Sequence, residues 1–569
     1  MAFDGIVTKA IASELQQLSG ARIDKIFQPN KNTILLGFYL SGYNYLLNIC
    51  ADAQNYRINL TTHTKPNPKV APNFCMILRK HLLGLHIKNV ITNNLERLVI
   101  IDFEGFDDID DIITKRLVVE LLGKHCNIIL LDEQNIIIDS LRHINNNEDS
   151  SRCIVPHAKH TYPEVTKSNF LDCLTFEDFY SKISLGSNIS DVFNGISKSF
   201  IDNSINHLGI KDLNENTLKI LYEYIKKIIY LTDSNSLEFK LINEKKKDYL
   251  LVESNTSSSN FNLNFFIDDF YYEKETSEEF KTYRDSILKM ILDVLKKYKK
   301  RLSNIDEKLS SCNDMEKYQL YGELITGNLY RIKNENVKEI TVENYYKNNK
   351  KLTIQLDERF TPSVNAKRFF KKYHKLKNTL EIVTLQKEET LKELNYIESI
   401  VYELENCSTL SEVSEIFEEI SENVVFKEKT DNYKNKKKSK VKKSTLTKNK
   451  NVSFNPIKYN IDGHTLLVGR NNKENDYLTL KFAKKTDIWL HTKDIYGSHA
   501  ILQVNSDKLP NDSILIKCAQ ISAYHSKARL SSNVPVDICE VKYVKKPNSA
   551  KPGMVIYTNQ KTLYVEPKI

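Results

Sequence analysis

The sequence contains no long apolar run and no paired cysteine motif. None of its apolar stretches approaches the roughly 18 residues of a membrane-spanning helix, so we expect no membrane partner. The nine cysteines are scattered and form no C-x-x-C pair, which argues against a disulfide framework and against a zinc site. The first residues include Asp4 and no apolar segment, so we expect no signal peptide. These absences favour a reducing, cytoplasmic compartment.

The common catalytic motifs are also missing. Gly123-Lys124-His125 resembles the end of a phosphate-binding loop, but residue 118 is valine and residue 125 is neither serine nor threonine. The sequence contains no G-x-G-x-x-G, H-E-x-x-H or G-x-S-x-G motif. We therefore expect a binding protein rather than an enzyme, with no catalytic residue, no cofactor and no metal site.

The sequence does contain the composition of a globular chain and one strongly basic segment. Apolar residues make up 41% and charged residues 27% of the 569 residues, and this length predicts about three to five structural units. Residues 427–450 hold eleven lysines against Glu428 and Asp431, a net of +9 that equals the formal charge of the whole chain. Such a segment predicts an unfolded basic linker, either a solvated tether or one that binds nucleic acid by displacing counterions.

Apolar periodicity predicts the secondary structure on both sides of this linker. Near the N-terminus it indicates a helix ending at Gly20, a second helix from Pro72 to Gly84, and strands between and after them. Residues 170–250 resemble a series of short helices. The last 120 or so residues alternate strand-like segments with one helix. The predicted strands are 33–40, 45–50, 98–103, 127–131, 466–468, 487–493, 497–502, 535–544 and 553–557, and the last predicted helix is 514–527.

Two heptad seams occupy the middle of the chain. The first contains Leu288, Ile291, Leu295, Tyr298, Leu302, Ile305 and Leu309. The second extends from Tyr373 to Leu404 and is interrupted by the polar residues Lys387 and Thr390. Strand-like segments at 337–342 and 351–356 lie between them. We expect an antiparallel coiled-coil arm about 40 Å long with a small folded tip, a seam between two chains of a dimer being the alternative.

One strand near the C-terminus is the first candidate nucleic-acid site. Alternation places a carboxylate, an indole, an imidazole and an ammonium on one face of the strand. If that face is exposed, the aromatic ring could stack on a base and the ammonium could contact phosphate. An ordinary strand with a satisfied Trp/His pair is the alternative. The candidate residues are Asp487, Trp489, His491 and Lys493, followed by Ser498 and His499 and by Lys545 and Lys546 in a proline-bounded basic turn.

The second candidate site lies in the N-terminal part. Glu96 and Arg97 begin a predicted strand, close in sequence to Arg79 and Lys80 on the helix that starts at Pro72. A guanidinium held by a neighbouring carboxylate suits bidentate contact with phosphate. An isolated surface ion pair is the alternative.

Several longer motifs, taken in order along the whole chain, resemble the NFACT family. The motifs are NFCMILRKHL at 73–82, GKHCN at 123–127, YGELITGNLY at 321–330, Asn365-Ala366 with FKKY at 370–373, and DIWLH at 487–491 with GSH at 497–499.

This resemblance implies an α+β multidomain protein. An NFACT-N domain, similar to the N-domain of formamidopyrimidine DNA glycosylases, would be followed by a helix-hairpin-helix region, a long antiparallel coiled-coil arm, a lysine-rich linker and an α/β NFACT-R RNA-binding domain. The corresponding ranges are 1–168, 169–275, 276–426 with a tip at about 310–365, 427–452 and 453–569.

The resemblance also implies a function. Bacterial members of the family bind large (50S) ribosomal subunits carrying peptidyl-tRNA, bring in alanyl-tRNA and support mRNA-independent addition of C-terminal alanines. The family's Asp-Arg pair for tRNA handling matches Glu96-Arg97, with a carboxylate one methylene longer. Glycosylase chemistry is not implied, because residue 2 is alanine rather than the nucleophilic proline. A surface adhesin that binds fibronectin is the alternative function.

Overall fold

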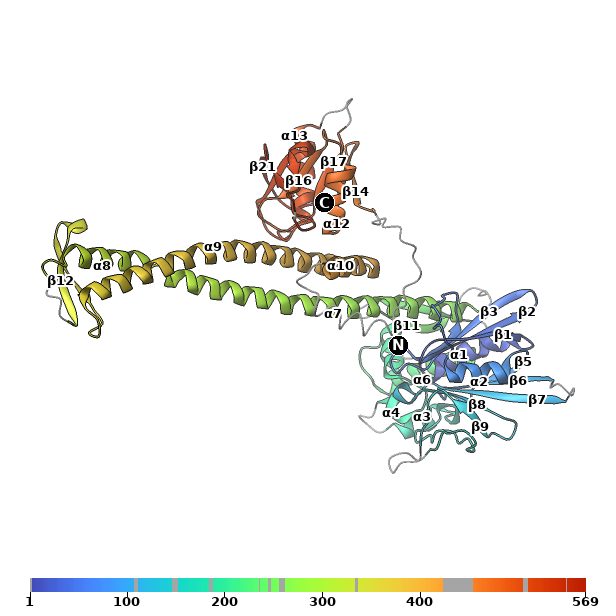
Figure 1. Cartoon of the computed structure of the whole chain (residues 1–569). Helices are drawn as coiled ribbons and strands as arrows, with labels where there is room; N and C mark the ends of the chain where they lie inside the picture. Colours follow the sequence, from blue (N-terminus) through green and yellow to red (C-terminus); the bar gives the residue numbers. More distant parts are fainter. Residues whose placement is uncertain are drawn as a thin grey trace. The chain divides into compact units, whose positions relative to one another are not determined.

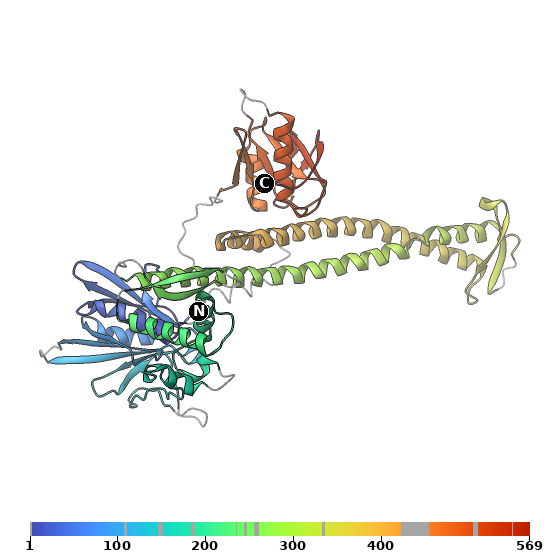
Figure 2. The ribbon, with the colours of Figure 1, turned by 180° about the vertical axis from the view of Figure 1, so that it is seen from behind.

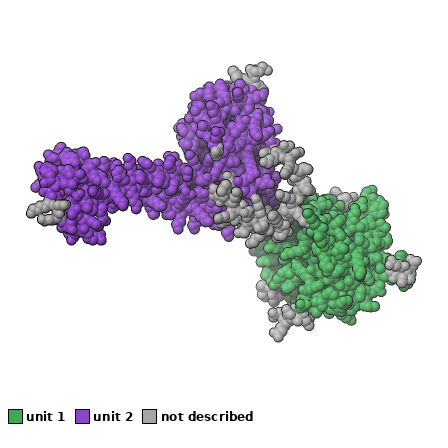
Figure 3. Space-filling view, in the orientation of Figure 1, with its two compact units in different colours: residues 1–277 green, residues 278–569 purple. Residues whose placement is uncertain are grey.

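The computed structural model forms two compact units, residues 1–277 and residues 278–569 (Figure 1; Figure 3). Both mix helices and sheets, as the sequence predicts. None of the helices in the described part of the chain is long and apolar enough to cross a membrane. The predicted lysine-rich linker lies outside the described residues. These are 3–106, 111–145, 152–183, 188–234, 236–243, 247–254, 261–332, 336–422, 454–504, 510–548 and 550–569.

The first unit is built on an antiparallel sheet with the order β4-β3-β2-β1-β5-β6-β7-β8-β9. Strands β1 and β5 pair through Arg22 and His86, at the start of both strands, and both halves of the sheet extend away from this junction. The strands are β1 (Arg22–Asn30), β2 (Thr33–Leu40), β3 (Tyr43–Cys50), β4 (Arg57–Leu60), β5 (His86–Ile91), β6 (Leu98–Phe106), β7 (Ile112–Glu120), β8 (Asn127–Leu131) and β9 (Ile137–Ser140).

Two helices pack against this sheet and share its core. Helix α1 (Gly5–Leu15) continues into the short helix η1 (Gln16–Leu18) and ends at Gly20, as predicted. Helix α2 (Asn73–Leu82) buries its apolar face, including Phe74 and Leu78, against β1. Burying these side chains supplies most of the stabilisation of such helices.

The region after residue 170 corrects one prediction. It is helical up to Leu231, in α3 (Phe176–Lys182), α4 (Ile189–Val192), α5 (Lys198–His207) and α6 (Glu215–Leu231). The helical interpretation is wrong for β10 (Leu237–Asn243) and β11 (Lys247–Glu253), which form a hairpin. The ring of Tyr249 lies 5.0 Å from that of Phe239 and packs edge-on, and this cross-strand aromatic packing stabilises the two strands over a helix.

In the second unit, residues 278–311 of one long helix and the whole of another lie side by side in opposite directions (Figure 1; Figure 2). Ion pairs from Lys299 to Glu398 and from Lys387 to Asp306 fix the antiparallel register of α7 (Asn262–Ser311) and α9 (Pro362–Asn406). The predicted seam positions are buried or half-buried. Lys387 is tolerated in the seam because it pairs with Asp306, and Thr390 because its hydroxyl donates to the Gln386 carbonyl.

The tip between these helices has its own small core. Helix α8 (Met315–Gly327) packs on the hairpin of β12 (Glu339–Asn344) and β13 (Lys350–Gln355), both predicted from the sequence. Leu324, Ile340 and Ile354 are buried between them.

A sheet with the order β14-β15-β17-β16-β18-β21 carries the C-terminal part. Helix α13 (Asp512–Tyr524) covers one face, and a second apolar cluster fills the other, so the central strand β16 (Ile488–Thr492) is buried on both sides. The remaining elements are β14 (Ile457–Ile461), β15 (His464–Val468), α12 (Asn472–Tyr477), β17 (Ala500–Leu502), β18 (Val534–Glu540), β19 (Val544–Lys545), β20 (Ile556–Tyr557) and β21 (Lys561–Val565).

Two buried carboxyl groups lie where α10 (Leu410–Glu422) packs on α9. Glu403 is 8% and Glu419 1% exposed. Burial and its neighbour Glu419 raise the pKa of Glu403. Burial likewise raises the pKa of Glu419 to about 7, against hydrogen bonds from Tyr396 and Asn472 and the charge of Lys473. The folded state therefore favours the protonated forms.

The sign of this linkage gives a pH prediction. Because both pKa values are raised on folding, the stabilising contribution is complete below the ordinary glutamate pKa and is lost as the pH rises through about 7. The free energy of opening measured by amide exchange along α10 should fall between pH 5 and pH 8, by at most about 1.4 kcal/mol per pH unit for each proton. Glu419→Gln should flatten this dependence, whereas Glu418→Gln, at an exposed position, should leave it unchanged. Equal pH dependence in both variants would contradict the assignment.

Candidate nucleic-acid interfaces

The two halves of the first unit's sheet meet at their strand ends, held by the guanidinium of Arg142. This side chain, which follows β9, donates to Asn32 Oδ1 at 3.2 Å and to the Ala51 carbonyl at 2.7 Å, beside the ends of β2 and β3. It also donates to the Lys124 carbonyl at 3.4 Å. A single arginine thus joins the loops at one end of the sheet.

Helix α1 begins close to the same place. Gly5 N–H donates to the Gly195 carbonyl at 2.8 Å, and a Cβ on either glycine would lie 1.8 Å from the Leu95 carbonyl oxygen. Such contact is possible only without a side chain. The packing sets Asp4, the cap of α1, within electrostatic range of Arg97.

The predicted Glu96–Arg97 ion pair is not formed. Glu96 accepts instead from Asn93 Nδ2 at 3.0 Å, and Arg97 Nη1 donates to the Tyr56 hydroxyl at 3.3 Å. Arg97 is half-buried, and the described residues offer no partner for the other guanidinium nitrogens. The charge of Arg97 is therefore not neutralised by Glu96, as the sequence had predicted.

The charges of Arg97 and Arg142 both act on the Cys126 thiol. Burial raises the pKa of Cys126 to about 11, and the charges of both guanidiniums oppose that rise. Both guanidiniums therefore act electrostatically on one thiol at the strand ends that Arg142 joins, which we call the converged strand ends. Arg142 donates to three acceptors within the fold, and Arg97 to one, the Tyr56 hydroxyl. Sequence reasoning missed Arg142 and Tyr56, because neither lies in a recognisable motif.

The basic residues of α2 differ in how far they are engaged within the fold. Arg79 Nε donates to the Ile26 carbonyl at 2.9 Å and its guanidinium lies 5.9 Å from the Phe27 ring, so Arg79 is largely used in packing. Lys80 is exposed. Burial, with the charges of Lys80 and Lys115, lowers the pKa of His81. No described contact joins Arg79 to Arg97, so the structure does not merge these predicted residues into one site.

The predicted stacking face on β16 is wrong. Trp489 is fully buried, in an apolar cluster with Leu467 and Ile501, and its ring lies 4.7 Å from that of Tyr557. The alternation argument assumed that one face of the strand meets solvent, but the chain folds elements over both faces. The indole cannot stack on a base in this fold.

Other polar residues of this predicted site also have structural roles. The carboxylate of Asp487 accepts from the backbone amides of Lys484 at 2.8 Å and Val504 at 3.0 Å, and so holds two loops. His499 Nδ1 lies 2.8 Å from the Thr479 hydroxyl, and burial lowers the pKa of His499 to about 3. Burial also lowers the pKa of His491. Ser498 donates its amide to the His525 carbonyl and is half-buried.

The lysines are the members of this set that reach the surface. Lys493 and Lys545 are exposed. Lys546, half-buried, is bonded to Asp476, so the predicted basic turn is only partly available to phosphate.

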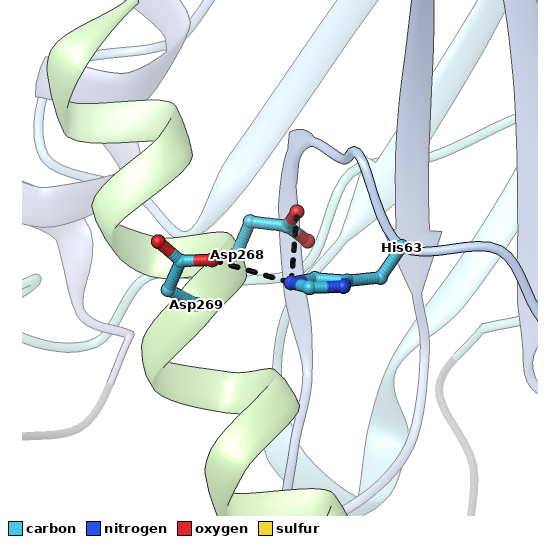
Figure 4. A group of neighbouring side chains, drawn as sticks. All are labelled: His63, Asp268 and Asp269. Atoms are coloured by element: carbon cyan, nitrogen blue, oxygen red, sulfur yellow. Dashed lines mark hydrogen bonds and ion pairs between the residues drawn. The ribbon is translucent and has the colours of Figure 1, made fainter.

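One His/Asp group has the donor types of a metal site (Figure 4). His63 Nε2 lies 3.2 Å from Asp269 Oδ1 and 4.0 Å from Asp268 Oδ2. Both oxygens of Asp268 already accept hydrogen bonds, from Asn59 Nδ2 and from Thr62 N–H, and Asp269 is 75% exposed. The donor set fits an ion poorly, and we assign the group to holding α7 against the segment after β4.

Two family models together match almost the whole chain. Residues 4–440 match the NFACT N-terminal and middle domains, and residues 450–559 match the NFACT protein RNA binding domain. The chain therefore belongs to the NFACT family, and its C-terminal part is the family's RNA-binding domain.

Individual relatives are similar over their full length. The Rqc2 homolog RqcH of Bacillus subtilis (strain 168) is 33% identical over 584 residues, covering 100% of this chain and 98% of the relative. The Rqc2 homolog RqcH of Streptococcus suis (strain 05ZYH33) is 33% identical over 575 residues, with the same coverage. Among solved structures, the C-terminal part of the Streptococcus suis fibronectin/fibrinogen-binding protein is 32% identical, with a TM-score of 0.38, covering 51% of this chain and 96% of that chain.

The single tryptophan offers a direct test of the corrected C-terminal site. Because Trp489 is buried, saturating tRNA should leave its fluorescence unchanged, and acrylamide should quench it weakly until the protein is unfolded in urea. Trp489→Phe should keep the RNA affinity within about twofold, whereas loss of a stacked base costs about 1–3 kcal/mol. Strong quenching by RNA together with a large loss in the variant would restore the stacking role.

Proposed function

We propose that this protein is a ribosome-associated quality-control factor that works by binding RNA. It binds large ribosomal subunits carrying peptidyl-tRNA, recruits alanyl-tRNA and supports the mRNA-independent addition of alanines to the nascent chain. The observation that carries the proposal is the full-length similarity to proteins named Rqc2 homolog RqcH, combined with the RNA-binding domain. Its place of action is the cytoplasm.

We assign tRNA binding to the converged strand ends of the first unit. Arg97 has unused donors there, and guanidinium groups suit phosphate because they offer several N–H groups in one plane. Exposed Lys80 on α2 is an additional phosphate contact, and Glu96 fixes the loop through Asn93. We take this unit to be a glycosylase-like scaffold that holds nucleic acid without a nucleophile.

We assign subunit anchoring to a coiled-coil arm formed by α7 and α9. Lys299 is engaged with Glu398, but its neighbours Lys296, Lys297, Lys300 and Arg301 are exposed on α7. A row of cations on a stiff helix can neutralise several phosphates of ribosomal RNA at once, which gives strong and salt-dependent binding.

Peptide-bond formation is left to the ribosome in this proposal. The protein supplies position: the first unit holds the tRNA, and the arm holds the particle. This division accounts for a sequence whose motifs favour binding over catalysis.

The most informative experiment is to sequence the RNA that co-purifies with the tagged protein from cells. The proposal predicts large-subunit ribosomal RNA together with tRNA enriched for the alanine acceptors. Fractionation separates this from the fibronectin-binding alternative: a ribosome factor follows the 50S peak and leaves it in high salt, whereas an adhesin is accessible at the cell surface.

A substitution at the strand ends tests the tRNA assignment. Arg97→Gln should reduce tRNA recovery about tenfold while leaving co-sedimentation with large subunits unchanged, because it removes an anion contact and no ion pair within the fold. Arg22→Gln is the control, since it removes the same charge at the β1–β5 junction, together with an exposed ion pair to Asp24 that contributes little to stability. Equal tRNA recovery in the two variants would remove Arg97 from the site.

Shortening the arm tests the anchoring assignment. Joining Ile305 to Glu388 through a short Gly-Ser turn, with glutamine in place of the four exposed cations of α7 named above, removes the outer arm and those charges and leaves the core around Ile291 and Ile397. We expect co-sedimentation with large subunits to be lost and tRNA binding to be retained. A shortened protein that still follows the 50S peak would show that the anchor lies elsewhere.

A further inference from the structure

Helix α10 carries a row of carboxylates. Residues 410–422 contain five glutamates and no lysine or arginine. Four of the glutamates follow at steps of three, four and three, which places them along one side of the helix. We call Glu412, Glu415, Glu419 and Glu422 the acidic row. The fifth, Glu418, lies off this side and is exposed.

The acidic row meets consecutive residues at the start of α12 in the RNA-binding domain. Arg470 Nη1 lies 3.3 Å from Glu412 Oε1, and Lys473 Nζ lies 2.8 Å from Glu422 Oε2. Between them, Asn471 donates to Glu415 at 3.1 Å and Asn472 to Glu419 at 3.4 Å. Every residue from 470 to 473 therefore contacts one member of the row.

Helix α9 extends the same contact. Lys551 is bonded to Glu393, and its ammonium lies 4.6 Å from the centre of the Tyr396 ring. The Tyr496 hydroxyl donates to Glu398 at 3.1 Å. We call Arg470, Lys473 and Lys551 the basic edge of the domain. Each cation of this edge faces a carboxylate of α9 or α10. Arg470 is also held within its own domain by Glu474, to which its Nε donates at 3.1 Å, whereas Lys473 and Lys551 pair with the helices.

The contact has the charge pattern of nucleic-acid recognition. Neighbouring members of the acidic row lie about 5–6 Å apart, and Glu412, Glu415 and Glu422 present negative charges along it, as an RNA backbone does, whereas Glu419 is buried among them. The side chains of Arg470 and Glu412 are only 18% and 16% exposed, so the pair is shielded from solvent more than ordinary surface pairs are. An RNA strand at this edge must displace the helix.

We propose that the acidic row of α10 and RNA compete for the basic edge of the C-terminal domain, so that the domain is held off RNA while it is docked on α9 and α10. This inference rests on the proposed function, in which that domain binds RNA. When RNA binds, its phosphates take the place of the glutamate carboxylates beside these cations, and the domain separates from α9 and α10. The acidic row then sets how much RNA is needed before the domain engages.

The test compares three full-length variants for binding to a labelled tRNA transcript at several salt concentrations. The row variant Glu412→Gln/Glu415→Gln/Glu422→Gln removes the competitor. The control variant Glu388→Gln/Glu405→Gln/Glu418→Gln removes the same charge from exposed positions on the same two helices. The edge variant Lys473→Gln/Lys551→Gln removes two cations and also breaks the docking. Amide exchange in α12 reports docking in each of them.

The row variant should lose protection in α12 and bind the transcript about tenfold more tightly than the control variant. The edge variant should also lose amide protection in α12, but it should bind the transcript more weakly. Its log affinity should fall less steeply with log salt concentration, as expected when about two phosphate contacts are lost. Loss of docking in the row variant with the affinity of the control overturns the inference, and so does an edge variant with unchanged affinity. A protein that binds no RNA in any form overturns the proposed function itself.

Discussion

The arrangement of the first unit depends on the guanidinium of Arg142. The two halves of the sheet are joined where β1 pairs with β5. At the opposite ends of the strands, Arg142 donates to the Asn32 side chain and the Ala51 carbonyl. The Arg142 side chain is half-buried, and its donors are met by the carbonyls of Lys124 and Ala51 and by the Asn32 side chain. The Arg97 guanidinium, whose charge acts on the same Cys126 thiol as that of Arg142, makes one described hydrogen bond, to the Tyr56 hydroxyl.

Elsewhere in the chain, hydrogen-bond and ion-pair partners also show which charged side chains are engaged within the fold and which are exposed. Arg79 is used in packing by the Ile26 carbonyl, and Lys546 is held by Asp476. Lys493, Lys545 and Lys80 remain exposed. The cations at the start of α12 are occupied by glutamates of α10, which makes their availability conditional rather than fixed. A polyanion-binding protein is described better by which cations are free than by its net charge.

The sequence predicted elements whose signal is local. The seams of α7 and α9, the helix from Pro72 and the strands of the tip follow from periodicity alone. Where tertiary packing decides, prediction failed: β10 and β11 form a hairpin because Tyr249 meets Phe239, and Trp489 is buried because elements cover both faces of β16. Arg97 was singled out by its place at the start of a predicted strand and again by the family resemblance, whereas its partner Tyr56 is 41 residues away and carries no sequence signal.

Ultraviolet crosslinking of the purified protein to tRNA, followed by mass spectrometry of the peptides, tests the central claim most directly. The account predicts crosslinked peptides that contain Tyr56 or Arg97 from the converged strand ends, and none that contains Trp489. Crosslinks confined to other surfaces of the first unit, or centred on Trp489, would contradict it.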